Sequence, residues 1–110
     1  MSYVPDKGEI IELSLESQES GGEIKELALV MSPQAFNEAL GLAWISPITF
    51  VKSRHLFQLD LPENVGTFGT VKLEQLYTVD FKSRQATLKD KVPAAFMERC
   101  RTAAGRVLGY

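Results

Sequence analysis

A short apolar stretch near residue 72 contains a basic residue, an acidic residue and an amide within four positions. Lys72 and Glu74 lie two residues apart, and Gln75 follows directly. Alternate residues of a β-strand project from the same face, so the ammonium and the carboxylate are predicted to lie side by side. A carboxylate accepts a proton, and an ammonium donates one or binds an anion, which is the chemistry of general acid–base catalysis. An isolated pair of this kind more often marks the solvated face of a strand.

Other polar residues occur where predicted strands begin or end. Thr49 is placed at a strand end and would supply a hydroxyl, and the basic residues Lys52 and Arg54 follow it in a predicted loop. Lys25 and Glu26 open another strand, where adjacent side chains point to opposite faces. These residues are the remaining candidates for a site that handles charge.

The elements that must position these residues are short strands followed by one helix. A stripe formed by Phe96, Cys100, Ala103 and Val107 predicts an amphipathic helix over 94–108. Strands are predicted over 11–15, 27–31, 42–46, 55–61, 70–77 and 85–88, with loops over 16–23 and 62–69 and one or two helical turns over 34–40.

This order of elements predicts a mostly β, α+β domain that spans residues 1–110: a small antiparallel, barrel-like sheet with a C-terminal helix. The strand over 42–46 is expected to stop near Pro47, because proline cannot donate a hydrogen bond to a central ladder. The aromatic residues Trp44 and Phe50 are expected to fill the core.

Composition excludes several classes of protein. The chain has 110 residues, of which 45% are hydrophobic and 24% charged, as in ordinary globular proteins. A single cysteine, Cys100, excludes a disulfide scaffold, and with one histidine, His55, a zinc site is improbable. No signal peptide and no membrane-spanning stretch is present, so we expect a cytoplasmic protein without a metal or other cofactor.

Charge is divided unevenly along the chain. Residues 1–38 contain eight acidic and two basic side chains, whereas residues 39–110 contain six acidic and ten basic ones. The net charge of −2 therefore conceals an acidic segment and a basic segment. This asymmetry indicates a charged partner and argues against an all-over basic coat for indiscriminate nucleic-acid binding.

Four blocks of sequence resemble, in order and spacing, the MazF/PemK (Kid) family of toxins. Together they extend over most of the chain. They are YVPDKGEII at 3–11, LALVMSPQAFN at 27–37, GLAWISPIT at 41–49 and VKLEQLYTVDFKSR at 71–84.

The resemblance implies a fold and an activity. The family has an SH3-like barrel with a C-terminal helix, forms homodimers and cleaves single-stranded RNA without metal, leaving a cyclic phosphate and a 5′-hydroxyl. Each member acts in the bacterial cytoplasm and is neutralised by an antitoxin with an acidic, disordered tail. The resemblance therefore implies a sequence-specific endoribonuclease toxin with RNA and an antitoxin as its partners.

The resemblance also assigns roles to residues. Metal-free RNA cleavage needs a base for the 2′-hydroxyl, an acid for the 5′-oxygen and donors to the phosphate. Glu74 would be the base, Lys72 the acid or phosphate clamp, and Thr49 a phosphate donor. The family's catalytic loop-exit arginine aligns with Glu26. Lys25 would take over the role of that arginine if a bulge turned the Lys25 side chain to the same face. Expected RNA-binding residues are Lys52, Arg54, Gln75, Lys82 and Arg84.

Two alternatives remain open because of the acidic residue at the loop exit. In the first, the chain is a catalytically impaired MazF-like barrel that binds an antitoxin or another protein. In the second, which the sequence blocks support less, the barrel inhibits gyrase as the related CcdB toxins do. The family's loop glutamate is also absent at Ser20-Gly21-Gly22.

Overall fold

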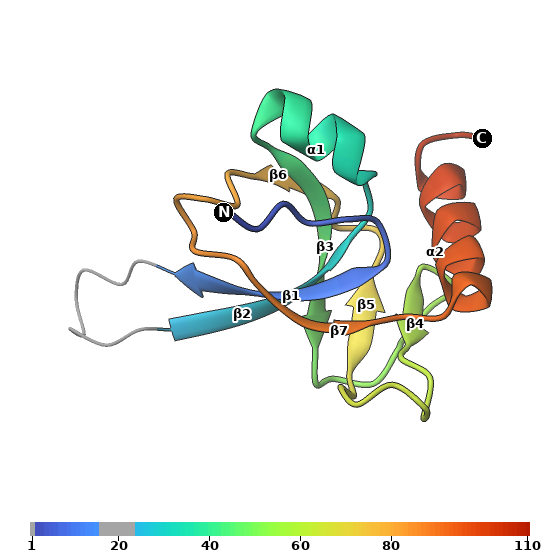
Figure 1. Ribbon diagram of the computed structural model, residues 1–110. Coiled ribbons are helices and arrows are strands. Elements are labelled where there is room, and N and C mark those ends of the chain that lie inside the picture. Colours follow the sequence, from blue (N-terminus) through green and yellow to red (C-terminus); the bar gives the residue numbers. More distant parts are fainter. Residues whose placement is uncertain (1, 16–23) are drawn as a thin grey trace.

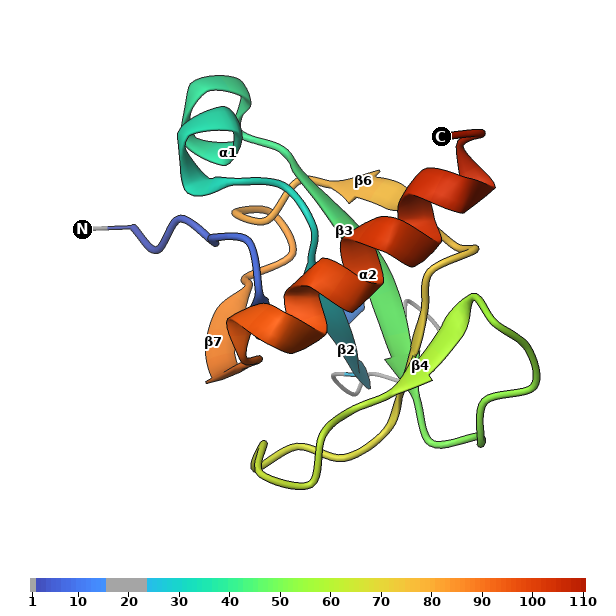
Figure 2. The ribbon, with the colours of Figure 1, turned by 90° about the vertical axis from the view of Figure 1, so that its right-hand side faces the viewer.

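The chain folds into a curved antiparallel sheet of seven strands with a short helix near one end and a longer helix across one face (Figure 1; Figure 2). The computed structural model describes residues 2–15 and 24–110, and the loop predicted over 16–23 lies outside this part of the chain. The elements are β1 (Glu9–Leu15), β2 (Ile24–Val30), α1 (Gln34–Leu40), β3 (Ala43–Thr49), β4 (Gln58–Asp60), β5 (Thr70–Lys72), β6 (Tyr77–Val79), β7 (Thr87–Lys91) and α2 (Ala94–Val107).

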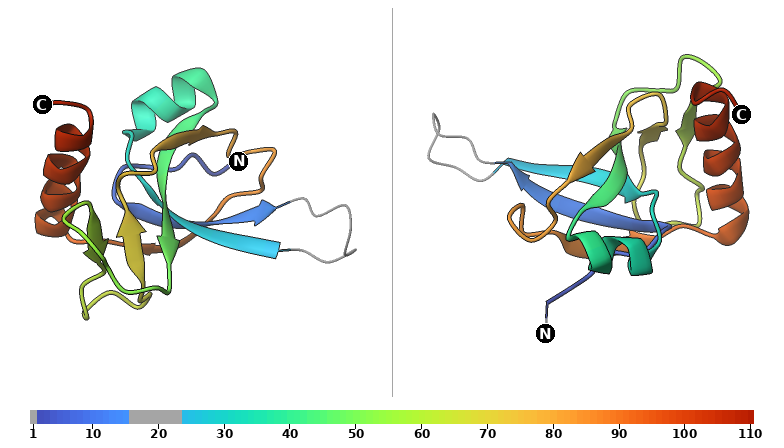
Figure 3. Two further views of the ribbon diagram at one scale, coloured as in Figure 1. Left: turned by 180° about the vertical axis from the view of Figure 1, so that it is seen from behind. Right: turned by 90° about the horizontal axis from the view of Figure 1, so that it is seen from above.

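Both helices lie where the sequence predicts them. α2 begins directly after Pro93, whose missing N–H leaves no hydrogen bond unmade in the first turn. It buries Phe96, Cys100 and Ala103 of the predicted stripe, whereas Val107 at its end is half-exposed. The views in Figure 3 show α2 against one side of the sheet and α1 at its end. Within the described ranges no helix is long and apolar enough to cross a membrane.

The sheet has the strand order β4-β5-β3-β2-β1-β7, and β6 pairs with β3 on the edge that β5 also uses. All of the strand pairs are antiparallel. The sheet is not closed, but its curvature agrees with the barrel-like fold that the sequence predicts. The mostly β, α+β assignment with a C-terminal helix is therefore confirmed.

The prediction that the third strand stops near Pro47 is wrong. β3 continues to Thr49, with Pro47 opposite Ala28 of β2. On its other edge β3 pairs with β6 up to Ile45 and with β5 from Ile48 onward. Pro47 therefore lies between these two partners, where a missing backbone N–H interrupts neither ladder.

Two of the predicted strands are shorter in the structure. The strand expected over 55–61 is reduced to β4, because a turn in which the Gln58 N–H donates to the His55 carbonyl precedes it. The strand expected over 70–77 breaks after Lys72, where a turn separates β5 from β6. Lys72 and Glu74, which were predicted on one strand, therefore lie at the end of β5 and in the turn that follows it.

The two faces of the sheet bury separate apolar clusters. One cluster lies between the sheet and α2 and includes Ile10, Leu29, Val71 and Phe96. The second lies on the opposite face and is covered by the N-terminal segment and the chain around β6. Alternate apolar residues of a strand belong to different clusters, because successive side chains point to opposite faces of the sheet.

The prediction that Trp44 and Phe50 fill the core is wrong. Trp44 is 41% exposed and Phe50 is 72% exposed. Trp44 lies on β3 in the part that pairs with β6, whereas Phe50 directly follows the end of β3. Neither ring belongs to the two apolar clusters.

Candidate active site

Polar side chains line one face of the sheet where β4, β5 and β3 run side by side. The cross-strand pairs set Asp60, Thr70 and Thr49 in one row, and Gln58 and Lys72 form a second row on the same face. The Thr70 hydroxyl donates to the Asp60 carboxylate at 2.7 Å. The row between them is apolar and points to the opposite face, toward α2. We call the five polar residues of the two rows the polar face: Asp60, Thr70, Thr49, Gln58 and Lys72.

Glu74 joins the polar face from a turn. The strand ends at Lys72, so the prediction that both residues lie on one continuous strand is wrong. The Gln58 side-chain amide nevertheless donates to Glu74 Oε1 at 2.9 Å, and Gln58 lies directly opposite Lys72. The structure therefore brings Lys72 and Glu74 together through Gln58. Gln75, the next residue, is exposed.

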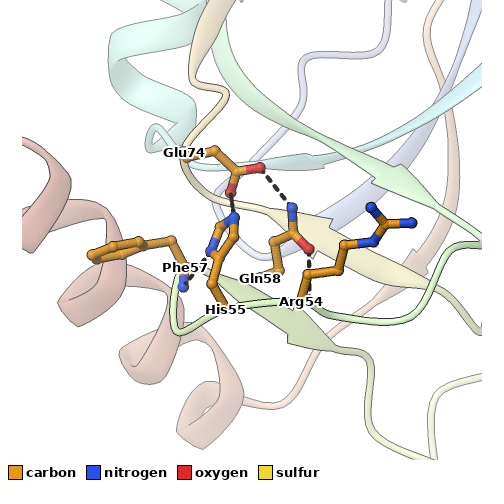
Figure 4. A network of polar contacts seen from close by, with 5 residues as sticks. All are labelled: Arg54, His55, Phe57, Gln58 and Glu74. Atoms are coloured by element: carbon orange, nitrogen blue, oxygen red, sulfur yellow. Dashed lines mark hydrogen bonds and ion pairs between the residues drawn. The ribbon is translucent and has the colours of Figure 1, made fainter.

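The Glu74 carboxylate belongs to a network of polar contacts (Figure 4). His55 Nε2 lies 3.8 Å from Glu74 Oε2, and the Phe57 N–H donates to His55 Nδ1 at 3.2 Å. A neutral imidazole that accepts at Nδ1 carries its proton on Nε2, the nitrogen that faces Glu74. The Arg54 N–H donates to Gln58 Oε1 at 3.0 Å, whereas its guanidinium points away from the carboxylate.

Two unsatisfied polar atoms lie at this site. Among the residues that the structure describes, three buried side-chain atoms have no hydrogen-bond partner: Ser46 Oγ, Thr49 Oγ1 and Glu74 Oε2. Buried polar atoms normally have partners, and exceptions are frequent at catalytic positions. The Thr49 hydroxyl and one Glu74 carboxylate oxygen therefore have unused hydrogen-bonding capacity at the polar face.

The loop-exit residue Glu26 is held by two partners. The Tyr77 hydroxyl donates to its Oε1 at 2.7 Å, and Arg84 Nη2 lies 3.4 Å from its Oε2. Arg84 Nε also donates to the Ser14 carbonyl at 2.6 Å. Burial, followed by the hydrogen bond to Glu26, raises the pKa of Tyr77 above its ordinary value, so the phenol stays a donor. The predicted RNA-binding residue Arg84 is therefore engaged with Glu26.

Several predicted basic residues lie apart from the polar face. Lys25 is paired with Glu12 at 3.2 Å, on the face opposite to Glu26, and the β1–β2 register contains no shift that would turn it. The substitution by Lys25 that the sequence suggests is therefore not made. Lys82 lies in the turn after β6 beside the N-terminal segment. Lys52 is exposed in the β3–β4 loop.

Sequence reasoning missed part of the site. It placed His55 at the start of a predicted strand and considered it as a possible zinc ligand, and it did not single out Gln58, Asp60 or Tyr77. His55 carried one usable signal, since it is the chain's only histidine. Gln58, Asp60 and Tyr77 gave no such signal in the sequence, because their roles depend on how the strands pair. Across the described part of the chain, no group of three or more His, Cys, Asp or Glu side chains could hold a metal ion.

Solved structures resemble this fold over almost its whole length. A chain of the MazE–MazF complex from Deinococcus radiodurans is 33% identical, has a TM-score of 0.88 and covers 97% of this chain and 98% of its own length. MazF alone from the same organism is 32% identical with a TM-score of 0.84, covering 99% and 100%. The fold and the elements that frame the polar face are thus those of a MazF-type protein.

The family model agrees with the structural comparison. The model described as PemK-like, MazF-like toxin of type II toxin-antitoxin system matches residues 6–108, so the chain belongs to this toxin family. An endoribonuclease from mycobacterial species is 18% identical with a TM-score of 0.81, covers 97% and 93%, and shows the shared fold alone. No curated protein sequence matches the chain significantly.

Proposed function

We propose that this chain acts as a metal-independent, sequence-specific endoribonuclease on single-stranded mRNA. Its membership of a toxin family and its structural likeness to MazF support this reading. The observation that carries it is the Glu74 carboxylate. Gln58 holds one of its oxygens at 2.9 Å, and the other is buried without a hydrogen-bond partner among the described residues.

The polar face offers the groups that metal-free cleavage needs. Glu74 takes the proton of the ribose 2′-hydroxyl, and the 2′-oxygen attacks the phosphorus. The bond from phosphorus to the 5′-oxygen breaks, Lys72 gives that oxygen a proton, and a 2′,3′-cyclic phosphate and a 5′-hydroxyl result. The Thr49 hydroxyl donates to a phosphate oxygen as charge grows on it. Lys25, on the other face, has no part in these steps.

Neighbouring residues position the base and the RNA. His55 faces Glu74 Oε2 and acts as a positioning residue that keeps this oxygen oriented toward the ribose. Arg54 and Gln75 are exposed beside the polar face, and Lys52 is exposed in the β3–β4 loop. All three would contact phosphates or bases.

We assign two further partners from the relatives. Solved MazE–MazF complexes, and a mycobacterial endoribonuclease solved with its cognate antitoxin, support an antitoxin for this chain. Its acidic, disordered tail would lie against basic side chains at the surface, among them Lys82, which is exposed in the turn after β6, and Arg84, beside its partner Glu26. We further propose a homodimer that acts in the bacterial cytoplasm.

Cleavage of a long mRNA in EDTA tests this function. We expect 3′ fragments with a 5′-hydroxyl and 5′ fragments with a 2′,3′-cyclic phosphate, identified by enzymatic end-labelling. Folded, dimeric protein that leaves the mRNA intact, or that cuts only after a divalent metal is added, would refute the proposal.

A catalytically impaired barrel that binds an antitoxin or another protein is the second candidate. The observation in its favour is Glu26, a carboxylate on the side of the sheet where phosphate would bind. In that case the EDTA assay gives no products, whereas antitoxin binding persists in a titration followed by calorimetry.

A further inference from the structure

Two exposed phenylalanine rings stand together at the end of β3. Phe50 directly follows the strand and is 72% exposed, and Phe68 lies in the loop before β5 and is 76% exposed. Their ring centroids are 5.7 Å apart and their planes are inclined by 55°. Neither ring contributes to the apolar clusters. The fold therefore leaves this aromatic pair accessible to a ligand.

The backbone holds the pair in place. Gly69 has a φ of +147°, and a Cβ there would lie 2.8 Å from Ile48 Cγ2 and 2.9 Å from the Thr49 carbonyl oxygen. Only glycine allows the loop to approach β3 this closely. This contact sets Phe68 beside Phe50, so the pair depends on the packing of two elements.

Positive charge flanks one side of the pair. A hollow beside Phe50 is lined by Lys25, Lys89, Glu12 and Glu26. Each of the two carboxylates is paired with a cation. Glu12 lies 3.2 Å from Lys25, and Glu26 lies 3.4 Å from the Arg84 guanidinium. Lys89 is exposed and adds positive charge beside the ring.

We propose that Phe50 and Phe68 form a stacking platform for unpaired RNA bases, with Lys52 and Lys89 on the adjoining phosphates. The identity of the ligand rests on the proposed function. Phe50 directly follows Thr49, the proposed phosphate donor, so the platform lies at the same end of β3 as the proposed cleavage point. Aromatic side chains with nearby cations are how proteins bind single strands, because every base offers a π-face.

The platform also accounts for the strandedness of the substrate. Bases in a duplex are stacked on their neighbours and cannot lie on protein rings, whereas the bases of a single strand can be splayed out. A protein partner would instead need apolar area of any kind, which an aliphatic side chain supplies equally well. Replacing phenylalanine by leucine therefore separates the two kinds of partner.

Binding of a non-cleavable RNA tests the platform without requiring activity. The probe is a fluorescein-labelled 20-nucleotide 2′-O-methyl single strand of mixed sequence, measured by anisotropy. We expect Phe50→Leu and Phe68→Leu each to weaken binding by roughly 5- to 150-fold, the range for losing one stacked base. Leu40→Ala, at an exposed apolar position on α1, is the matched control and should leave the affinity unchanged.

A tryptophan in place of the phenylalanine gives a direct signature. Phe50→Trp should restore tight binding, and the probe should quench the added fluorescence beyond any change at Trp44 in the unmodified protein. The proposal is overturned if the leucine variants bind as tightly as the parent, or if the same sequence annealed into a duplex competes with the labelled probe as well as the unlabelled single strand does. It is equally overturned if the leucine variants keep RNA affinity but lose self-association or antitoxin binding.

The two proposals fail independently. A chain that binds the probe through the two rings yet cuts no RNA keeps the platform and refutes the endoribonuclease proposal. A chain that cuts RNA with leucine at both positions and an unchanged KM refutes the platform alone.

Discussion

Glu26 places a negative charge on the side of the sheet that carries the polar face. Ala28 pairs with Pro47, and Glu26 and Thr49 each lie two residues further along, so their side chains point the same way at the same end of the β2–β3 pair. For a phosphate at Thr49 and a separation of roughly 8 Å, the repulsion is about 0.5 kcal/mol in water and about 2 kcal/mol at an effective dielectric constant of about 20. Glu26→Gln removes this repulsion and still offers Tyr77 an acceptor. We expect kcat/KM to rise roughly 2- to 30-fold.

Initial rates of mRNA cleavage in EDTA measure this effect. The gain should shrink as salt rises from 50 to about 300 mM, because exposed charges are then screened. Glu98→Gln is the matched control: it makes the same change in net charge on α2, where Glu98 is paired with Arg101 at 2.8 Å. An unchanged or lower rate for Glu26→Gln, or an equal gain for Glu98→Gln, would contradict the electrostatic reasoning.

Three further predictions follow from individual contacts. His55→Gln should lower kcat by about tenfold with KM and Tm unchanged, because only the orientation of the base is lost; a change confined to Tm would show a merely structural role. Gly69→Ala should lower the free energy of unfolding by about 1–3 kcal/mol in urea melts, because its Cβ would collide with the end of β3; unchanged stability would mean that the loop moves freely. Burial raises the pKa of Cys100 to about 12, so the native thiol stays protonated while the unfolded thiol ionises. The contribution of Cys100 to stability should therefore fall by up to about 1.4 kcal/mol per pH unit above about pH 9, and Cys100→Ala should show a shallower slope between pH 9 and 10, where the raised pKa of Tyr77 still contributes.

Much of the fold was predictable from local patterns. The helical stripe around Cys100 was read from its periodicity, and the strand over 27–31 from a continuous apolar run. The structure confirms the helix as α2 and has a strand, β2, over most of the second stretch. The continuation of β3 through Pro47 was not predictable, because it depends on which strand flanks each half of β3. Single-sequence patterns do not encode that pairing.

The candidate site was predictable only in part. Lys72, Glu74 and Thr49 were singled out from the sequence, and the structure gathers them on and beside the polar face. The break between β5 and β6 was missed because the alternation of a strand runs on through residues 70–74, past the end of β5 at Lys72. Gln58 and His55 were missed because both reach Glu74 across a sheet from a segment more than fifteen residues away.

The central claim is that Glu74 is the base of a metal-free RNA cleavage. The most direct measurement is the single-turnover rate of mRNA cleavage in EDTA for Glu74→Gln, compared with Glu63→Gln at an exposed loop position. The account predicts a loss of about 100-fold or more for Glu74→Gln, with unchanged folding and probe binding, and no loss for Glu63→Gln. Equal rates for the two variants would contradict it.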